Sequence, residues 1–522
     1  MGITSDIVIG IPESDLCGFV CNLIREHGDD IALVDATTEQ SFTFNQVCDL
    51  SIKFASVLNK RGLRRQEVVA VCCSNCIEYP ILVLGAAANN AISTTCNPHY
   101  TYHEMLKQFQ HCQPKFVITN ADQVEKVKQI ADQVKSIQEI FTVDESTEVI
   151  SIQKLLEKED GTSFPTNVSF DVKEDVLLLP YSSGTTGFPK GVMHTHYSFV
   201  SLMHYAMHTK PPMRLVTYTC IPLFHILGIL RQFANLIKGW KHIIDKRFNV
   251  EQLLKCVEKY KVNTMTSVPP MLVALQNYQH FDKYDTSSLK IVGSGAAPLA
   301  LTVKNKTSKN LGVDIVQGWG LTEMLVSVHR SPNYPEGSVG QLMPNTQFKV
   351  VDPDSLKELG INEDGECWVK GPQLMKGYYK NQSETSRCIT SDGWFRTGDI
   401  GHYDENGFIF IVDRLKELIK YKAFQVPPAE LESVILSNPK VADVGVTGIP
   451  DPEAGEVPRA YVVRKDGTLT EEELNNFVQS RVSKYKYLYG GIKFVNSIPK
   501  SPTGKILRRK LHEHAFKELN KL

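Results

Sequence analysis

The feature of this sequence that most constrains its fold is a repeated alternation of short β-rich runs with longer helix-like segments. Apolar positions recur at helical spacing over residues 45–62, and β-rich runs follow at 67–72 and 115–119. Strands that alternate with helices in this way form layered α/β structures with parallel sheets. The 522 residues suffice for about two to four such packing units.

The pattern changes after about residue 335. Segments 347–351, 366–370 and 408–412 are predicted to be short strands separated by Asp, Gly and Asn turns, as in a small β-barrel or meander. We therefore expect residues 1–413 to form a large N-terminal domain of layered α/β subdomains with a small β-barrel-like subdomain.

A second unit is predicted after this boundary, because helical and extended patterns resume beyond Arg414. Its length, 414–522, suits a small α+β domain. The expected helices span 428–436 and 471–482, and the expected strands span 441–448 and 459–464.

Charge and composition exclude several classes of partner. Lys plus Arg number 57 and Asp plus Glu number 58, so the net charge argues against nucleic acid or an anionic membrane as the main partner. No stretch approaches the ~20 apolar residues of a membrane-spanning helix. The cluster Cys72, Cys73 and Cys76 lacks a second ligand pair, so it is interpreted as buried thiols rather than a zinc site.

The strongest motif is a loop of glycines and hydroxyl side chains that follows an apolar strand and ends with Lys190. Its glycines permit close approach of the backbone, and its hydroxyl and backbone N–H groups can surround phosphate oxygens. It is not a Walker A loop, because Gly191 follows the lysine where Ser or Thr is required. The predicted phosphate contacts are Ser182, Ser183, Gly184, Thr185, Thr186, Gly187 and Lys190.

This loop resembles the signature of the adenylate-forming superfamily, which includes acyl-CoA synthetases, 4-coumarate:CoA ligases, beetle luciferases and peptide-synthetase adenylation domains. The similarity runs from about residue 30 to 511 and is closest to the 4-coumarate ligase and fatty-acyl ligase branch. The resemblance implies an enzyme that uses ATP, Mg²⁺ and coenzyme A, and it assigns roles to further segments.

Two segments resemble the adenine-binding and metal-binding parts of this family. In the first, Gly295, Ala296 and Ala297 would let adenine lie flat against the backbone. In the second, Trp319 would stack on adenine, Thr322 would bond the α-phosphate, and Glu323 would hold Mg²⁺. Gln317, Gly318 and Gly320 would flank the nucleotide.

Three further positions complete the implied adenylation site. Asp399 matches the carboxylate that accepts hydrogen bonds from the ribose hydroxyls, and Arg414 would bond ribose or phosphate. The loop Pro499-Lys500-Ser501-Pro502-Thr503-Gly504-Lys505 resembles the loop that carries the catalytic lysine. The Lys505 ammonium would stabilise both the attacking carboxylate oxygen and the developing phosphate charge.

A second set of residues is implied for thioester formation. In the family the small domain rotates between the two steps, and the segment after the boundary then approaches the thiol. Lys416 matches the hinge, while Lys420, Phe424 and Gln425 lie in this segment. Ala423 departs from the usual glycine, which puts an added methyl where backbone lies close to the pantetheine arm.

The acid-binding pocket is predicted to be apolar. His225 resembles the family's histidine beside the acyl pocket, where it can gate the pocket or bond a phosphate oxygen. Leu227 replaces a Tyr common in 4-coumarate ligases, and Leu325 follows the metal carboxylate. These side chains favour a medium- or long-chain fatty acid, or a fatty-acid-like substrate, over a hydroxycinnamate.

The C-terminal residues predict a location. Asn520, Lys521 and Leu522 resemble the peroxisomal Ser-Lys-Leu address, with Asn in place of the small first residue. We expect binding to a peroxisomal import receptor, with the cytoplasm as the alternative location.

Four alternatives to a fatty-acid CoA ligase share the motifs. They are a hydroxycinnamate CoA ligase, a monooxygenase of the luciferase kind, an adenylating enzyme that loads a carrier protein, and a nucleotide-binding protein without catalysis. The presence of Lys190, Glu323, Asp399 and Lys505 argues against the last, because a decayed site is expected to lose some of them.

The role of Lys505 is testable by substitution. Lys505→Ala is expected to slow acyl-adenylate formation by roughly 10²–10³-fold, by analogy with the loss of one preorganised donor. The measurement is acid-dependent pyrophosphate release without a thiol. Adenylate formation at the parent rate would show that Lys505 has another role.

Overall fold

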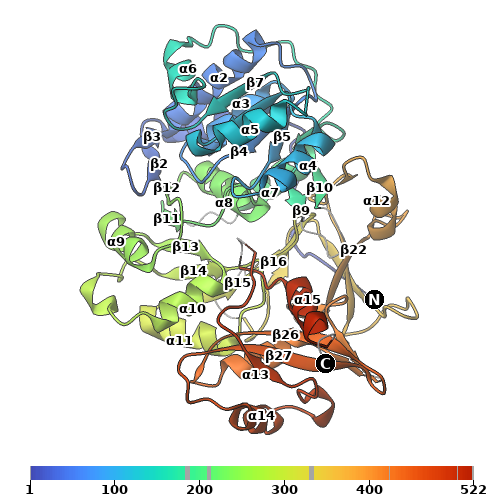
Figure 1. Ribbon diagram of the computed structural model, residues 1–522. Helices are drawn as coiled ribbons and strands as arrows, with labels where there is room; N and C mark the ends of the chain where they lie inside the picture. The colour runs from blue at the N-terminus through green and yellow to red at the C-terminus, as the bar shows by residue number, and fades with distance from the viewer. Residues whose placement is uncertain are drawn as a thin grey trace.

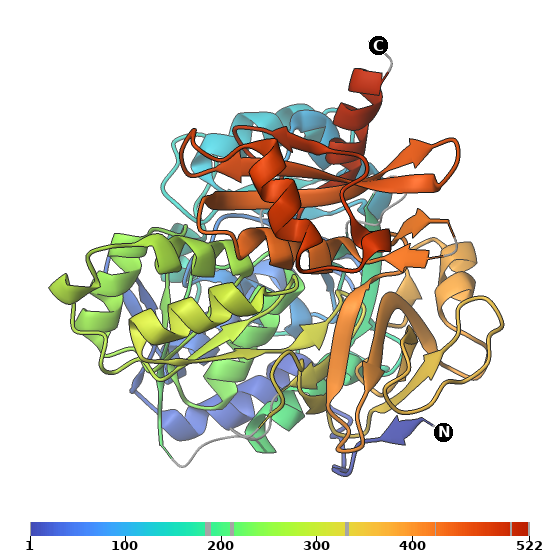
Figure 2. The same ribbon diagram turned by 90° about the horizontal axis from the view of Figure 1, so that it is seen from below.

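The molecule consists of a large N-terminal domain and a small C-terminal domain that lies against it (Figures 1 and 2). The computed structural model describes residues 2–182, 189–208, 213–328, 334–422, 424–501 and 504–519, with side chains described to residue 515. The combination of α/β layers with a small mixed domain agrees with the predicted fold class.

The first layer is built on a mixed sheet in the order β21-β10-β8-β5-β4-β6-β7, with β9 paired to β10. Its central strands β4, β5 and β6 are parallel and fully buried, which explains the apolar sequence of β4. The strands are β4 (Val68–Cys72), β5 (Ile92–Thr95), β6 (Phe116–Thr119), β7 (Glu139–Thr142), β8 (Val176–Leu178), β9 (Tyr181–Ser182), β10 (Lys190–Thr195) and β21 (Gly377–Tyr378).

Helices around this sheet begin at side-chain caps that the sequence supplies. Thr43 and Gln46 form a capping box at the start of α2, and Thr101 and Glu104 form another at α4. The helices of this layer are α2 (Phe44–Lys60), α3 (Tyr79–Ala88), α4 (Tyr102–Cys112), α5 (Val124–Ala131), α6 (Ile152–Lys158) and α7 (His196–His208).

The second layer is a sheet in the order β15-β14-β13-β11-β12-β2-β3, parallel except for β3. Its strands are β2 (Ile31–Asp35), β3 (Ser41–Thr43), β11 (Val216–Thr219), β12 (Lys241–Ile244), β13 (Thr264–Ser267), β14 (Ile291–Ser294) and β15 (Asp314–Gln317). Its helices are α1 (Leu16–Ile24), α8 (Ile226–Ile237), α9 (Val250–Tyr260), α10 (Pro269–Asn277) and α11 (Leu301–Leu311).

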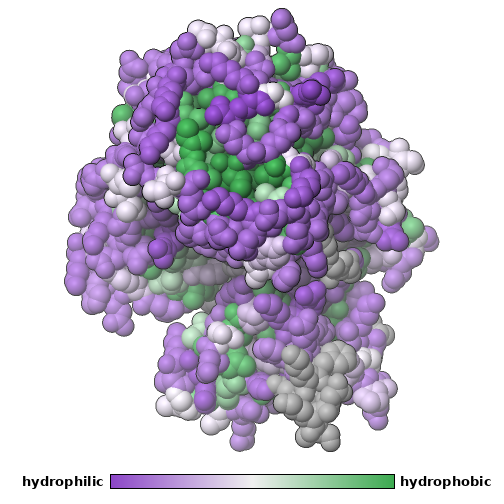
Figure 3. Space-filling view, turned by 45° about the horizontal axis from the view of Figure 1, so that its top comes forward, coloured by the Kyte–Doolittle hydropathy of each residue, from purple (hydrophilic) through white to green (hydrophobic). Residues whose placement is uncertain are grey.

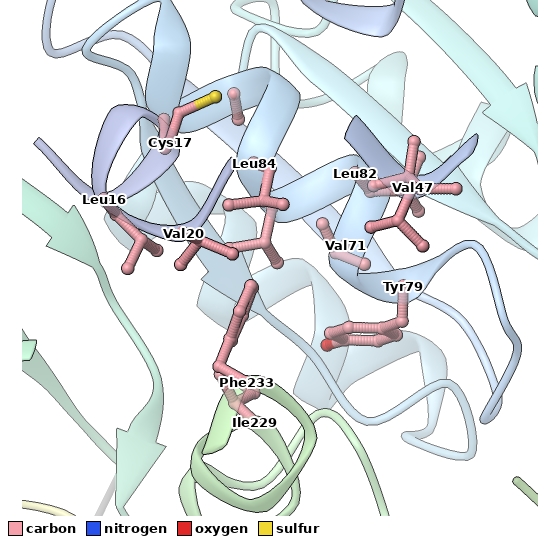
Figure 4. Packing of buried hydrophobic residues seen from close by; sticks show 14 of the residues in the cluster. Leu16, Cys17, Val20, Val47, Val71, Tyr79, Leu82, Leu84, Ile229 and Phe233 are labelled. Atoms are coloured by element: carbon pink, nitrogen blue, oxygen red, sulfur yellow. The ribbon is translucent and has the colours of Figure 1, made fainter. Parts of the chain in front are cut away.

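A shared core joins the two layers. Figure 4 shows Ile229 and Phe233 of α8 pointing toward Leu84 of α3 and Val20 of α1. The Phe233 ring also meets Phe199 of α7 edge to face, at 5.8 Å between centroids. This packing fixes the rotation of α8 about its axis and therefore decides which of its side chains face away from the core.

The third subdomain is an antiparallel meander in the order β1-β19-β20-β22-β23, with a three-stranded sheet β16-β17-β18 beside it. The helix α12 (Gln382–Cys388) precedes β22. The strands are β1 (Ile3–Thr4), β16 (Trp319–Gly320), β17 (Leu325–Val328), β18 (Gln341–Leu342), β19 (Gln347–Val351), β20 (Gly365–Lys370), β22 (Phe395–Tyr403) and β23 (Ile409–Arg414).

The C-terminal domain follows directly, since β23 ends at Arg414 and the next strand belongs to another sheet. The strands β26 (Val441–Asp451) and β27 (Gly455–Arg464) form a long hairpin, in which β27 is the central strand of the sheet and β26 lies at its edge. The other elements are β24 (Ile419–Tyr421), β25 (Phe424–Val426), β28 (Ile492–Phe494), α13 (Pro428–Leu436), α14 (Glu471–Gln479) and α15 (Arg508–Leu519).

The surface and the cysteines agree with the composition. One face of the molecule is largely hydrophilic, with a hollow whose floor is hydrophobic and whose rim is hydrophilic (Figure 3). In the described ranges no helix is long and apolar enough to cross a membrane, and no group of three or more His, Cys, Asp or Glu could hold a metal. Cys72, Cys73 and Cys76 are buried free thiols.

The C-terminal domain is held near the boundary by a buried ion network. Arg508, at the start of α15, donates to Glu417 at 2.9 Å and forms two bonds to Glu432. The carbonyl of Val446 accepts a further bond from Arg508 at 3.1 Å. Because Arg508 is nearly enclosed by these acceptors, their charges raise the pKa of its guanidinium despite burial.

Removal of this cation is expected to destabilise the domain. Arg508→Leu leaves two carboxylates buried without their partner, which costs about 3–5 kcal/mol in comparable networks. The free energy of unfolding of the full chain in urea measures the loss, followed by a probe in the C-terminal domain. Arg509→Leu is the matched control, because the Arg509 side chain is 72% exposed and its i,i+4 pair with Glu513 is solvent-screened. Equal effects of the two substitutions would contradict the network's role.

Candidate functional site

A cavity of about 1210 Å³ lies between the two domains and beside the second-layer sheet. It is lined by residues from the phosphate-loop hairpin, the loops after β14 and β15, α8, and the C-terminal domain. Cavities at domain interfaces and near the ends of parallel strands are the usual place for substrates in α/β proteins. The predicted residues that line it are Ser182, Lys190, His225, Leu227, Gly295, Ala296, Gln317, Gly318, Gly320, Thr322, Glu323, Leu325, Arg414, Lys416 and Lys505.

The phosphate-loop hairpin presents Ser182 and Lys190 side by side, since they pair in register between β9 and β10. The Lys190 ammonium forms an ion pair with Glu384 of α12 and lies 4.9 Å from the centre of the Tyr378 ring. The oxygens of a triphosphate can replace Glu384 as the partner of the Lys190 ammonium. The predicted contacts Ser183, Gly184, Thr185, Thr186 and Gly187 lie outside the described residues.

Glu323 is suited to hold Mg²⁺ together with phosphate oxygens. Its Oε1 accepts hydrogen bonds from Ser182 at 3.1 Å and from the Tyr378 hydroxyl at 2.8 Å. Oε2 accepts none of the hydrogen bonds found among the described residues, so it can coordinate a cation. A single carboxylate supplemented by phosphates and water is a typical magnesium site.

The backbone around Thr322 is fixed from two sides. Nε2 of the buried His194 donates to the Thr322 carbonyl at 2.7 Å, and burial lowers the pKa of His194 to about 4, so the ring is neutral. The N–H of Met375 donates to the carbonyl of Glu323 at 2.9 Å. These bonds leave the side chains of Thr322 and Glu323 directed at the cavity that they line.

The structure corrects the role predicted for Trp319. Its indole is 7% exposed, packs edge to face on Phe348 at 6.1 Å between centroids, and does not line the cavity. Its N–H donates to Asp399 Oδ2 at 2.8 Å. Trp319 therefore positions Asp399 from the core and does not stack on adenine in this arrangement.

Asp399 is held between two donors. Trp319 bonds one carboxylate oxygen, and Arg414 Nε lies 3.2 Å from the other. Burial raises the pKa of Asp399, while Arg414 and the indole N–H oppose that rise. Asp399 itself does not line the cavity, whereas the neighbouring residues Thr397, Gly398 and Arg414 do.

Ala296 adopts a left-handed backbone, with φ of 69°. Non-glycine residues seldom take this conformation, and where they do it is typical of binding loops. The loop after β14 therefore presents backbone to the cavity at Gly295 and Ala296. Ala297, the third residue predicted there, does not line the cavity.

The Lys505 loop reaches the cavity from the C-terminal domain. Ser501 closes the loop, because its N–H donates to the Lys505 carbonyl at 2.8 Å and its Oγ accepts from the Lys505 N–H at 3.1 Å. Gly504 has φ of 79°, and a Cβ there would lie 2.5 Å from Pro270 at the start of α10. A side chain at this position would separate the loop from the N-terminal domain.

The ammonium of Lys505 forms no hydrogen bond or ion pair with the part of the chain that the structure describes. Burial lowers its pKa to about 8, and the positive charge of Arg414 contributes to the decrease. Glu417 and Asp399 oppose this shift. Lys505 is therefore a partly desolvated cation at a cavity that also contains Ser182 and Lys190.

His225 is the N-cap of α8 and lines the cavity. Its Nδ1 accepts a long hydrogen bond from the Leu227 N–H at 3.4 Å. Burial lowers the pKa of His225 to about 4, so the ring is neutral and its Nε2–H is a donor for a ligand.

The residues implied in thioester formation divide into two groups. Lys416 lines the cavity, whereas Lys420, Phe424 and Gln425 lie on the hairpin β24–β25 and do not. The Phe424 ring is 51% exposed and stacks on Tyr485 at 4.5 Å. In this arrangement the Lys505 loop is at the cavity and the hairpin is away from it. Ala423 lies outside the described residues, as do Asn520, Lys521 and Leu522, whose peroxisomal role stays a prediction.

Several functional side chains were missed by the sequence reasoning. Tyr378, Glu384 and Arg387 line the phosphate end of the cavity, and Arg231 and Lys238 line the acyl end. Arg231 and Lys238 are seven residues apart along α8, so they lie on one helical face, a signal that was available in the sequence. No local pattern pairs Glu384 with Lys190, which is 194 residues away.

Comparisons with known proteins cover both domains of the chain. A family model described as AMP-binding enzyme matches residues 22–379, and one described as AMP-binding enzyme C-terminal domain matches residues 430–505. The chain is 39% identical over 507 residues to 4-coumarate--CoA ligase 1 of Petroselinum crispum, with 94% of this chain and 92% of that protein covered. It is 36% identical over 528 residues to probable 4-coumarate--CoA ligase 2 of Dictyostelium discoideum, with 96% of each covered.

A solved structure shows the same fold. The crystal structure of ATP-bound MatB from Rhodopseudomonas palustris matches with a TM-score of 0.85 and 24% identity, over 95% of this chain and 98% of that chain. At this identity the likeness concerns the arrangement of the chain.

The state of Lys505 predicts a pH dependence. The ammonium form dominates below pH 8 and is lost above it, since the pKa of Lys505 is about 8. We expect kcat/KM for acid-dependent ATP–pyrophosphate exchange to fall by about tenfold per pH unit above that value. Lys505→Arg stays charged over this range and should lose the alkaline limb, whatever its absolute rate. An identical limb in both proteins would assign the titration to another group.

Proposed function

The chain belongs to the AMP-binding enzymes, and from this premise we propose that it activates an acid with a hydrophobic, aliphatic body. The protein is an AMP-forming ligase that uses ATP, Mg²⁺ and coenzyme A. The observation that carries the proposal is the shared cavity, which is lined by Lys505, Glu323 and Lys190 and by an apolar wall.

The first reaction joins two anions. A carboxylate oxygen of the acid attacks the α-phosphorus of ATP, the bond to the β-phosphate oxygen breaks, and pyrophosphate leaves. Lys190 would neutralise phosphate charge, Glu323 would hold the Mg²⁺ that adds to this neutralisation, and Lys505 would stabilise the attacking and developing oxygens. All three side chains line the cavity. His225 is a neutral donor beside the acyl site, so it can bond the substrate without adding charge.

The second reaction transfers the acyl group to the thiol of coenzyme A and releases AMP. It requires Lys505 to withdraw, because that loop occupies one wall of the cavity. The hairpin with Lys420, Phe424 and Gln425 is the segment proposed to replace it, through rotation about Lys416.

An aliphatic acid is supported by the wall opposite the sheet. Leu202, Met203 and Ala206 of α7, with Leu227 and Leu230 of α8, contribute branched or flexible side chains. Leu325 and Val328 of β17 close the same wall. Flexible aliphatic walls adapt to alkyl chains, and Met is especially accommodating.

A hydroxycinnamate is the second candidate, because the relatives reported above carry the name 4-coumarate--CoA ligase. The phenolic end of such an acid requires a polar partner, and Tyr205, Asn235 and Thr217 line the cavity. The two candidates therefore differ in the side chains that they require at the far end of the pocket: polar ones for a hydroxycinnamate and aliphatic ones for an alkyl chain.

Acid-dependent pyrophosphate release, measured with and without coenzyme A, tests the proposal. Straight-chain fatty acids of increasing length and hydroxycinnamates form the panel, and acyl-CoA is identified by mass. We expect a straight-chain acid to give the highest kcat/KM, and Leu227→Tyr to shift the ratio toward 4-coumarate by roughly tenfold. Pyrophosphate release at the same rate with and without an acid would overturn the ligase assignment. A hydroxycinnamate as the best substrate of the unaltered enzyme would replace the aliphatic acid by the second candidate.

A further inference from the structure

The acyl end of the cavity contains an arginine that the adenylation chemistry does not use. Arg231 lies on α8, less than two turns after His225, which corresponds to about 9 Å along the helix axis. The side chain is accessible to solvent and lines the cavity, but it is surrounded by protein. Its Nη2 is near β14, since a Cβ on Gly293 would lie 3.7 Å from it.

The packing of α8 explains why this arginine points inward. Ile229 and Phe233 occupy the core face of the helix, as Figure 4 shows. Leu227, Arg231 and Ala234 follow one another at helical spacing on the face that lines the cavity. Rotation of α8 to release Arg231 would expose its core side chains, so the guanidinium is fixed toward the acid site.

Arg231 has no carboxylate partner within the described ranges. Burial lowers the pKa of its guanidinium, and the neighbouring Tyr205 opposes that decrease. The carboxylates that line the cavity are engaged elsewhere: Glu323 with Tyr378, and Glu384 with Lys190. Glu366, the third, accepts from Trp368 and from the Gly398 N–H.

A second cation lies farther along the same helix. Lys238, the C-cap of α8, lines the cavity and lies 4.5 Å from the centre of the Trp240 ring. Burial and the charge of Arg231 lower the pKa of Lys238 to about 8. The two cations therefore line one cavity, in which the charge of Arg231 disfavours the charged form of Lys238.

Unpaired polar atoms surround this compartment. Nδ1 of His242 and Nε1 of Trp240 are buried without a hydrogen-bond partner among the described residues, and both side chains line the cavity. Burial lowers the pKa of His242 to about 3, so it adds no charge of its own. Buried polar groups without partners are costly, so a ligand group that bonds these two atoms is favoured.

We propose that the acid activated by this enzyme carries a second anionic group at its far end, and that Arg231 binds it with Lys238 beyond. The inference rests on the proposed function and names its substrate class, an aliphatic α,ω-dicarboxylic acid. A carboxylate matches the guanidinium fork in a bidentate pair, and only one of the two carboxylates reaches the reacting position. The aliphatic wall contacts the chain between them.

The nucleotide is a poor alternative occupant of this compartment. The phosphate end has its own cations, Lys190, Arg387 and Lys505, and a carboxylate for the metal. Arg231 and Lys238 lie farther along α8, whereas His225 is its N-cap. A nucleotide role for Arg231 would change KM for ATP with every acid, whereas an acyl role changes discrimination between acids.

Paired acids of equal chain length provide the test. Acid-dependent ATP–pyrophosphate exchange is measured on the full-length enzyme with monocarboxylic and α,ω-dicarboxylic acids over a range of lengths. We expect the dicarboxylic member to have the higher kcat/KM at the preferred length. Arg231→Met should lower that value by about 30-fold or more, as for loss of one partner of a buried charge pair. The kcat/KM for the monocarboxylic member and the KM for ATP should not change with it. Arg231→Lys should restore part of the preference for the dicarboxylic acid.

Lys246→Leu is the control, because Lys246 is exposed and outside the cavity. Thermal unfolding of the unaltered enzyme gives a readout that needs no variant, since the dicarboxylic acid should raise Tm more than its monocarboxylic partner. Three results would overturn the inference and leave the ligase assignment intact. They are equal kcat/KM for both series of acids, equal Tm shifts with both, and a change in KM for ATP with every acid in Arg231→Met. Exchange with no acid of either series would instead overturn the proposed function.

Discussion

The structure depends on the placement of one ammonium group where two anions must meet. A carboxylate and a triphosphate repel each other, and the Lys505 loop supplies the charge that offsets this repulsion. The loop reaches the cavity because Gly504 allows it to lie directly on Pro270. Its base is fixed by Arg508, whose buried bonds to Glu417 and Glu432 tie the start of α15 to the domain boundary. Domain stability and catalytic geometry thus rely on the same few charges.

The cavity has two ends with different electrostatics. At the phosphate end, the cations Lys190 and Arg414 are each paired with a carboxylate, Glu384 and Asp399 respectively. Such pairs keep the site stable when phosphate is absent and exchange partners when it arrives. At the acyl end, Arg231 and Lys238 have no such partner in the described chain, so the compensating charge must come from the ligand or from solvent. This asymmetry is what separates the choice of acid from the activation of ATP.

Local patterns predicted most elements well, and the exceptions have identifiable causes. The helix expected at 428–436 and the strand expected at 347–351 occur with those bounds, because apolar periodicity and flanking Pro or Asp residues define them locally. The strand expected at 459–464 begins earlier, at Gly455, because its partner β26 extends the ladder. Trp319 was predicted to face the nucleotide, but a register shift between Trp319 and Gly320 in the β16–β17 pair accompanies its burial in the core.

The sequence alone determined the layered fold, the reactive groups and the family, because helix and strand periodicity, glycine-rich turns and short motifs are properties of neighbouring residues. Only the tertiary structure decided which side chains share the cavity and which neutralise one another. The bonds Trp319–Asp399 and Lys190–Glu384 join residues 80 and 194 positions apart. The helical pattern of α8 does not predict the direction of the Arg231 side chain. The packing of Ile229 and Phe233 in the core sets that direction, because it fixes the rotation of the helix. Long-range packing sets the direction of a side chain, and direction decides whether a charge is a surface group or part of a binding site.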